Sequence, residues 1–505
     1  MTIDDPGVAP FCILSQDITF YDTCTNTKYS DKIQKKEVSK LKNALLRKKS
    51  IVDMQNNHQS SLRKELKTFD LTMLGIGAII GTGIFVLTGT GALTAGPGLI
   101  ISFIIAALAC GFAALCYAEF ASMVPASGSA YTYSYATLGE LVAFIIGWDL
   151  LLEYLLAVST VSVGWSGYFQ SLLAGFGIHL PHALTAAPGA TPEGGTYFNL
   201  PAFIIVILVT TLISIGVRET KRVNNIMVVV KVAVVLLFIV VAIFYVKPSN
   251  WTPFLPFGFS GVFTAAATVF FAFIGFDAIA SSAEETVNPS KTLPKGILIS
   301  LGICTVLYVV VTGIMTGVVP YKNFAPYIDH PVSAVLKIAG QNWISGIIDV
   351  GAILGMTTVM IVMLYGQTRI TFAMSRDGLV PPIFSKVSKK YNTPFIATWV
   401  FGLIAAILGS LIPLDELAEL VNIGTLSAFV LVSFSILVLR KTQPDLPRAF
   451  RTPLVPLVPI LAIGFCLFLI INLNPLTWER FAIWLVVGLA LYFLYSRKHS
   501  KLNEK

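Results

Sequence analysis

Charged residues are scarce in this sequence: Asp, Glu, Lys and Arg make up only 12% of its 505 residues, whereas 55% are hydrophobic. Soluble domains carry about 25% charged residues, so this composition excludes a soluble enzyme or a soluble binding domain. The mean hydropathy of +0.77 instead indicates several helices that each cross a lipid bilayer. We therefore expect an all-α polytopic membrane protein.

Cysteine and histidine are also few, with six and five residues. None of them has the spacing of a metal site, and the apolar segments contain no nucleophile paired with a base. We therefore expect neither an enzyme nor a metal or cofactor site. The first 30 residues lack the basic and apolar regions of a signal peptide, so we expect no cleavage there. Four cysteines lie in apolar segments and are expected to serve in packing: Cys110, Cys116, Cys304 and Cys466.

Hydropathy along the chain predicts twelve membrane-spanning helices. The polar residues 1–68 before them are expected to form a cytoplasmic N-terminal tail, with a basic piece near 40–49 that contacts anionic lipid. Residues 497–505 are expected to form a C-terminal tail. The predicted spans are 71–93, 98–121, 140–172, 199–217, 223–246, 259–283, 295–319, 345–374, 394–412, 417–440, 453–472 and 478–496.

The placement of basic residues predicts the orientation of these spans. With the N-terminus inside, 30 of the 35 Lys and Arg residues fall in the tails and loops on the cytoplasmic side, as the positive-inside rule requires. Only Lys247, Lys322, Lys337 and Arg480 fall outside. We therefore expect a plasma-membrane protein with both termini in the cytoplasm. The net charge of +8 follows from this topology and does not indicate a nucleic-acid partner.

Glycine-rich sequence interrupts two of the spans. In the first span the stretch 74–85 contains four glycines, with Thr82 between the last two, and the sixth span contains Gly275 and Asp277 in its middle. Glycines also permit close helix packing, but the two spans are five apart, so the second set of five helices would run in the inverted sense. Interrupted helices at matching places in two inverted halves indicate a binding site at the membrane midplane. We expect the halves to be 69–246 and 259–440, with 453–496 outside the repeat. The four glycines are Gly75, Gly77, Gly81 and Gly83.

Several motifs resemble those of the amino acid–polyamine–organocation superfamily. They are GIGAIIGTGIF at 75–85, the YAEF to GSAY segment at 117–131, and the EETVNP to LP segment at 284–294. SRDGLVP at 375–381 resembles the cationic amino acid transporter branch and its bacterial relatives. The resemblance covers about 62–500, and the first 45 residues are longer than usual in these relatives. It implies a LeuT-like fold, a 5+5 inverted repeat with broken helices 1 and 6, and amino acid transport by alternating access.

The resemblance also implies which residues hold an L-amino acid. The substrate carboxylate would meet the N–H groups and hydroxyl at Thr82 and Gly83, and the ammonium would meet carbonyls near Ile79, Phe271 and Ile274. Phe271 is either a gate or plain core. Asp277 is either a partner for a cationic side chain or a cap at the break, whereas Met363 matches a position that limits side-chain volume. Because Asp277 favours cationic substrates and Met363 small ones, specificity stays open.

Lys231 lies in the middle of the fifth span, eight residues after Val223 and so about 12 Å deep. A buried lysine costs about 2.5–3.5 kcal/mol on insertion scales, so it is expected to have a partner or a task. Asp149 and Glu153, one turn apart on the third span, are possible partners. Desolvation favours the neutral lysine, which would let Lys231 load and release a proton. The alternative is a permanently charged structural pair.

The resemblance assigns the proton-coupling role to Lys231, in the place that sodium holds in related folds, and lets Glu153 tune it or relay its proton. We therefore expect a proton-coupled amino acid symporter. The alternatives are an exchanger without net proton coupling and a non-transporting amino acid sensor. Glu119, Glu284 and Glu285 lie at the cytoplasmic boundary, where they either form inside-closing contacts or face water. No feature of the sequence selects an accessory single-helix protein as a partner.

Overall fold

The computed structural model describes residues 47–48, 65–123, 129–191, 194–216, 221–277, 279, 282, 286–391 and 393–503. By its internal contacts the chain divides into two units, Met1–Arg47 and Lys48–Lys505, and every element below belongs to the second. Most of the predicted N-terminal tail, with Cys12 and Cys24, lies outside the described residues. So do Glu284 and Glu285.

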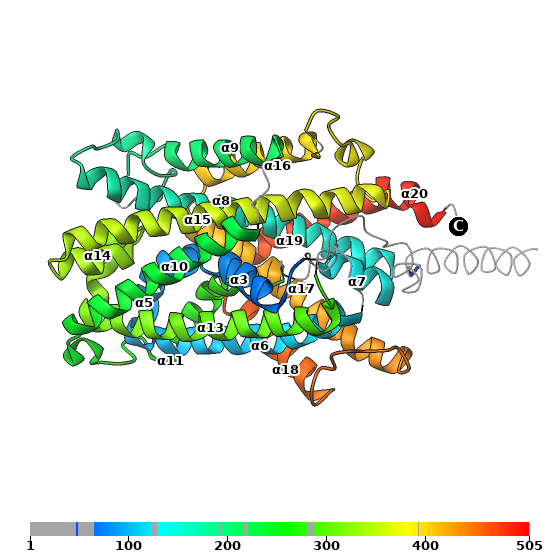
Figure 1. The fold of residues 1–505 in the computed structure, drawn as a ribbon, viewed down its shortest axis with the longest axis horizontal. Helices are drawn as coiled ribbons and strands as arrows, with labels where there is room; N and C mark the ends of the chain where they lie inside the picture. The colour runs from blue at the N-terminus through cyan, green and yellow to red at the C-terminus, as the bar shows by residue number, and fades with distance from the viewer. Residues whose placement is uncertain are drawn as a thin grey trace, which may run out of the picture. The chain divides into compact units, whose positions relative to one another are not determined.

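The described residues form helices and turns, and their only strand-like pairing is one isolated bridge between Leu66 and Thr286 (Figure 1). Up to residue 269 the helices are α3 Thr68–Ile79, α4 Thr82–Phe85, α5 Leu87–Ala95, α6 Leu99–Met123, α7 Ser129–Thr137, α8 Glu140–Gly175, α9 Leu200–Ser214, α10 Lys221–Ala242 and α11 Gly258–Val269. Those after it are α13 Pro289–Val318, α14 Pro331–Ile338, α15 Asn342–Arg376, α16 Phe395–Leu411, α17 Leu414–Thr442, α18 Leu457–Ile471, α19 Pro475–Leu491 and α20 Arg497–His499.

The lengths and compositions of these helices fit a multi-pass membrane protein. Within the described residues, seven helices are long and apolar enough to cross a membrane, and five shorter apolar helices accompany them. One of the seven, Leu87–Met123, runs through the predicted loop between the first two spans. A 3-10 turn at Gly96–Gly98 joins α5 to α6 there, so the two predicted spans are separated by a turn and not by a loop. The count of twelve spans and the inverted repeat stay predictions.

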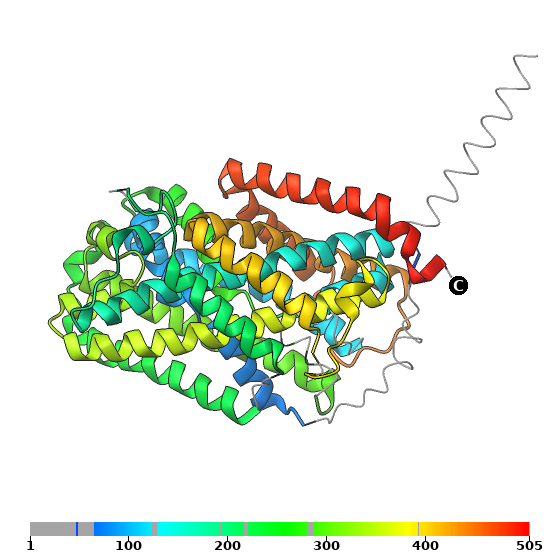
Figure 2. The same ribbon diagram turned by 90° about the horizontal axis from the view of Figure 1, so that it is seen from above.

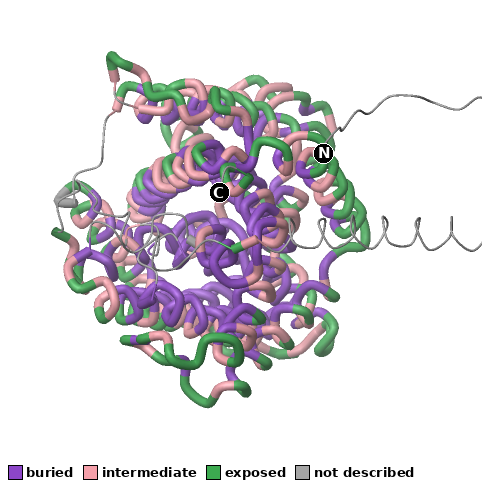
Figure 3. The backbone as a smooth tube through the Cα atoms, turned by 90° about the vertical axis from the view of Figure 1, so that its right-hand side faces the viewer, coloured by how far each residue is buried: buried purple, intermediate pink, exposed green. Residues whose placement is uncertain are grey.

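Burial separates inner from outer helices. The most apolar stretch of α8 is 78% buried, whereas that of the C-terminal helix, which contains α19, is only 22% buried. Figure 2 shows α19 running along the outside of the other helices, and Figure 3 shows buried residues gathered in the middle of the bundle. The exposed residues of α19 include Ile483, Val486 and Val487, which suit contact with lipid chains.

Both predicted interruptions are present. Helix α3 ends at Ile79, Ile80 is extended, and Gly81 adopts φ −158° and ψ −138° before α4 begins. In the sixth predicted span, α11 passes into the 3-10 turn η5, Phe270–Phe273, and the extended Ile274 follows. Each segment thus leaves helical geometry close to a glycine.

The two interruptions contact each other through their backbones. Gly275 has φ +115°, a conformation that favours glycine, and a Cβ there would lie 3.0 Å from the carbonyl carbon and oxygen of Ala78. A Cβ on Gly83 would lie 2.2 Å from the Cα of Ala272. Glycine at both positions therefore lets the first and sixth predicted spans approach to backbone distance.

Candidate functional site

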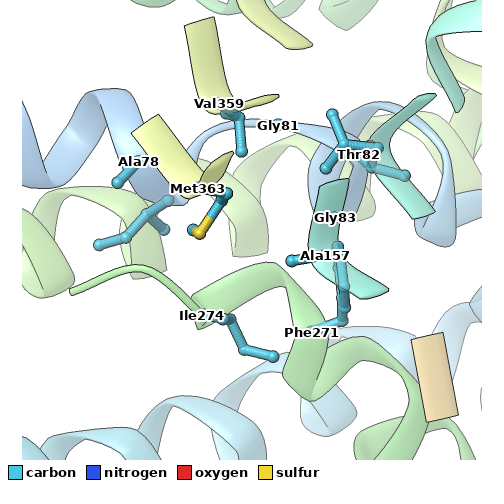
Figure 4. Close-up of a pocket in the computed structure, with 11 residues that line it drawn as sticks. Ala78, Gly81, Thr82, Gly83, Ala157, Phe271, Ile274, Val359 and Met363 are labelled. Carbon is cyan, nitrogen blue, oxygen red and sulfur yellow. The ribbon is translucent and has the colours of Figure 1, made fainter. Parts of the chain in front are cut away.

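A pocket with about 280 Å³ of unfilled space lies between the two interruptions. Figure 4 shows Met363 of α15 and Ile274 pointing into this space from different elements. Its eleven lining residues are Ala78, Ile79, Gly81, Thr82, Gly83, Ala157, Val161, Phe271, Ile274, Val359 and Met363.

Six of the predicted substrate residues are brought together by this pocket: Ile79, Thr82, Gly83, Phe271, Ile274 and Met363. Among the eleven described lining residues, Thr82 contributes the one polar side chain, and its hydroxyl donates to the Met356 sulfur at 3.4 Å. The other polar groups at the pocket come from the backbone. N–H groups at the start of a helix and carbonyls at its end lack intrahelical partners, so the pocket has donors at one break and acceptors at both.

Five lining residues were not predicted: Ala78, Gly81, Ala157, Val161 and Val359. Three of them had a signal in the sequence. Ala157 and Val161 follow Glu153 at intervals of four, so they continue the helix face on which Glu153 had already been placed. Val359 lies one turn before Met363 on α15 in the same way. Extending each predicted face by one or two turns would have found these three.

Asp277 does not line the pocket. Its carboxylate is buried, with 2% of the residue exposed, and accepts a hydrogen bond from the Tyr154 hydroxyl of α8 at 3.2 Å. The structure therefore places Asp277 behind the sixth-span interruption and apart from Met363, which lies in the pocket wall. Of the two residues expected to favour different substrates, only Met363 lines the pocket.

Lys231 contacts the end of the first interrupted helix. Its Nζ donates to the carbonyl of Gly77 at 2.6 Å and to that of Ile80 at 3.2 Å, and the residue is 1% exposed. A cation is stabilised at a helix C-terminus because the carbonyls there carry partial negative charge. The lysine methylenes pack beside Gly355 of α15, where an added Cβ would lie 3.4 Å from them, at ordinary contact distance. Sequence reasoning proposed carboxylate partners and missed these carbonyls.

Glu153 and Asp149 are both buried on α8. Glu153 lies against Thr425 of α17 and in electrostatic reach of Asp277. In the part of the chain that the structure describes, Oδ1 of Asp149 has no hydrogen-bond partner. The structure thus places Glu153 close to the sixth-span interruption, whereas Lys231 lies at the first.

Two side chains that the sequence did not single out support the interruptions. The Tyr308 hydroxyl of α13 lies 2.9 Å from the carbonyl of Ile79 and 2.9 Å from that of Ala272. Asn422 of α17 donates from Nδ2 to the carbonyls of Ala267 and Thr268 at 2.8 and 3.0 Å. Both serve carbonyls that lose their helical partners at a break. A tyrosine and an asparagine within long apolar runs gave no signal of this role.

At one end of the bundle, Glu119 is fully buried in an ionic cluster. Its carboxylate oxygens accept hydrogen bonds from Nε and Nη2 of Arg440, both at 2.9 Å. The backbone N–H of Thr452 donates to it at 2.8 Å, and Nε of Arg448 lies 3.1 Å away. Of the two expectations for Glu119, the structure shows the internal contact and not the water-facing side chain.

At the opposite end of the bundle lies α14 (Figure 1). Nζ of Lys337 donates to the Ser171 hydroxyl at 2.7 Å, and Ser171 donates to Asp349 at 3.0 Å. His330 precedes α14 and packs edge-on against Tyr168 and Tyr327. Burial, with a smaller contribution from Lys337, lowers the pKa of His330 to about 4. The imidazole is therefore neutral at physiological pH.

Comparison with known proteins places this geometry in a family. A model of the amino acid permease family matches residues 66–491. The branched-chain amino acid permease BcaP of Bacillus subtilis (strain 168) is 69% identical over 466 residues, which cover 92% of this chain and 100% of that protein. The methylthioribose transporter of the same organism is 55% identical over 463 residues, covering 91% and 100%. Cationic amino acid transporter 4 of Homo sapiens is 31% identical over 571 residues, covering 88% and 89%.

These matches confirm the superfamily that the motifs indicated. The family model spans the first interruption, the sixth-span interruption and the whole pocket between them. The chain therefore belongs to the amino acid permease family of the amino acid–polyamine–organocation superfamily, and it is a multi-pass membrane transporter and not an enzyme.

Proposed function

We propose that this chain is a proton-coupled symporter that carries small neutral L-amino acids across the plasma membrane by alternating access. Its two interrupted spans occupy matching places in the inverted halves 69–246 and 259–440, and both termini lie in the cytoplasm. The amino acid and the proton are its partners, together with the surrounding lipid. An accessory subunit is not part of the proposal.

The observation that carries this proposal is the lining of the pocket. Thr82 is the one polar side chain among the described lining residues, and the rest are aliphatic, aromatic, thioether or glycine. A zwitterion places its carboxylate at the N–H groups of Thr82 and Gly83 and its ammonium at the carbonyl of Ile79 and those near Phe271 and Ile274. The apolar walls then accept an apolar side chain. Asp277 accepts from Tyr154 outside the lining, so a cationic head group gains little. The 69% identity to a branched-chain amino acid permease supports the same class.

Proton coupling is assigned to Lys231. In its protonated form the ammonium holds the end of α3 through the carbonyls of Gly77 and Ile80. Loss of the proton removes the charge that these carbonyls stabilise, so α3 is released from α10. Glu153, buried on α8 near the sixth-span interruption, relays or tunes that proton. The proton gradient thereby sets the direction in which the pocket empties.

Uptake into proteoliposomes tests the coupling. Lys231→Met is expected to lose accumulation driven by an inward proton gradient while retaining leucine counterflow, because counterflow needs no net proton movement. Lys386→Met, which changes an exposed lysine, is the matched control and keeps both activities. Gradient-driven uptake by Lys231→Met at the wild-type level contradicts the coupling role. A wild-type protein that needs internal amino acid and ignores pH is an exchanger.

One relative favours a second substrate. The methylthioribose transporter shares 55% identity with this chain, and a neutral thioether sugar also suits a pocket of apolar walls with one hydroxyl. A thermal-shift panel of the twenty amino acids, ornithine and methylthioribose separates the candidates, because a ligand that binds only the folded state raises its melting temperature. The proposal expects the largest shifts from leucine, isoleucine and valine. Binding of these ligands without flux in liposomes identifies a sensor.

A further inference from the structure

The hydroxyl of Tyr308 lies between the two interrupted spans. Its oxygen is 2.9 Å from the carbonyl oxygen of Ile79 and 2.9 Å from that of Ala272. The residue is fully buried on α13, and its ring packs against Phe103 and Phe273 with centroids 5.6 and 5.3 Å apart. The ring is therefore held in place while the O–H bond is free to rotate.

One hydroxyl cannot satisfy both carbonyls at once. A tyrosine carries a single hydroxyl proton, and a carbonyl in a water-free interior needs a donor. Asn422 shows the contrasting case, because its amide has two hydrogens for the carbonyls of Ala267 and Thr268. Asn422 can therefore donate to both of its carbonyls at the same time. Tyr308 divides one proton between two acceptors, one in each interrupted span.

The two acceptors differ in their access to the pocket. Ile79 lines the pocket, whereas Ala272 is not one of its lining residues. The Cα of Ala272 rests against Gly83, where an added Cβ would approach it to 2.2 Å. A donor in the pocket can therefore reach the Ile79 carbonyl, and a firm bond to the Ala272 carbonyl holds η5 against the start of α4.

We propose that Tyr308 is a positioning residue that transmits occupancy of the pocket from the first interrupted span to the sixth. This inference rests on the proposed function, in which the substrate ammonium donates to the carbonyl of Ile79. When the ammonium takes that carbonyl, the Tyr308 hydroxyl turns fully to Ala272 and fixes η5 on α4. The O–H bond is not broken in this step. The substrate thus completes the contact between the two spans that must move together when the transporter changes state.

Tyr308→Phe tests this role, because it keeps the ring and its aromatic contacts and removes the hydroxyl. Leucine affinity is measured by calorimetry and leucine counterflow in proteoliposomes. The ammonium still finds the Ile79 carbonyl, so the dissociation constant is expected to stay within about threefold of wild type. The counterflow rate is expected to fall about tenfold, as for loss of one buried hydrogen bond of about 1.4 kcal/mol. A purely structural role would weaken binding and rate together.

Tyr168→Phe is the matched control. It removes another buried hydroxyl, which donates to the carbonyl of Phe85 at 2.6 Å, and Phe85 does not line the pocket. Its counterflow rate is expected to change less than that of Tyr308→Phe at unchanged affinity. An equal loss in both variants overturns the inference. So does an unchanged rate in Tyr308→Phe, or a loss of affinity that matches the loss of rate.

A measurement on the wild-type protein covers the case in which Tyr308→Phe does not fold. 4-Methylpentanoate is leucine without its amino group, so it cannot donate to Ile79. It is expected to compete with leucine for binding but to support no counterflow when loaded inside the vesicles. Counterflow at the rate given by internal leucine, or absence of competition, overturns the inference. Failure of the proposed function is a separate result, in which the wild-type protein neither binds nor carries leucine.

Discussion

At the scale of single residues, the backbone contact between the two interruptions requires glycine, because a side chain would not fit there. Gly275→Ala would place a Cβ 3.0 Å from atoms of Ala78 at φ +115°, where non-glycine residues are strained by about 1–3 kcal/mol. We expect a lower melting temperature and strongly reduced transport. Gly302→Ala is the control, because a Cβ there meets nothing within 4 Å and alanine favours the helix. Equal behaviour of both variants contradicts the tight contact.

Met363 sets the space available to the substrate side chain. Met363→Ala is expected to enlarge the pocket and to raise the affinity for phenylalanine relative to valine by about tenfold, since pocket methylenes discriminate by about 1–3 kcal/mol each. Met363→Leu conserves volume and keeps the wild-type order. Competition against labelled leucine measures both variants. If the order of phenylalanine and valine is unchanged in Met363→Ala, this residue does not limit size.

The sequence predicted six of the pocket residues because glycines, a threonine and a motif mark the breaks locally. It did not predict Tyr308 or Asn422, because each supports a break that lies in a different span from its own. It also gave no sign of the hydrogen bond that Asp277 accepts from Tyr154, 123 residues away in the chain. Contacts between distant segments carry no local signature in one sequence.

At the scale of the elements, α14 is held over the bundle by contacts that include one titratable ring. Burial lowers the pKa of His330 to about 4, below its ordinary value of about 6.5. Between these values the unfolded chain binds more protons than the folded one, so stability falls as the pH is lowered from about 6.5 to about 4. Above about 6.5 this contribution is fully present.

His330→Phe is expected to remove that part of the pH dependence, because it keeps a ring against Tyr168 and Tyr327 and has no group to protonate. The melting temperature, measured from pH 7 to pH 4, is expected to fall less in His330→Phe than in wild type. His179→Phe, in an exposed position, serves as the control and follows the wild-type curve. A variant whose curve parallels wild type throughout would show that His330 does not contribute.

Helix positions were predictable at this scale, because each membrane span needs a long apolar run and the chain has little else. Their ends were less so: α13 begins at Pro289, six residues before the predicted span, because Pro289 occupies the first turn of the helix. Proline is favoured there since its missing N–H has no helical partner anyway. The predicted gap between the first two spans, 94–97, coincides with the turn Gly96–Gly98 that joins α5 to α6.

At the scale of the whole molecule, the C-terminal residues dock where the sequence predicted a tail. Figure 1 shows α20 at the same end of the bundle as α7. The Ser496 hydroxyl donates to the carbonyl of Leu379 at 2.6 Å, and the N–H of Lys501 donates to that of Asp377 at 3.1 Å. These bonds join the last helix to the segment that follows α15. A short polar segment gives no apolar pattern from which such docking could be predicted.

The same segment also contacts α8, through the bond from the Ser500 hydroxyl to Glu140 at 2.6 Å. Glu140 is fully buried and also accepts from Tyr135 and Tyr492 at 3.1 and 3.2 Å. Ser500→Ala removes one donor from a buried carboxylate, which costs about 1–3 kcal/mol. We therefore expect a lower melting temperature, with leucine affinity unchanged because the pocket is distant along α8. Ser385→Ala removes a half-buried serine whose hydroxyl bonds to the carbonyl of nearby Pro382 and is expected to melt like wild type. If Ser500→Ala also keeps the wild-type melting temperature, the C-terminal segment does not stabilise the bundle through Glu140.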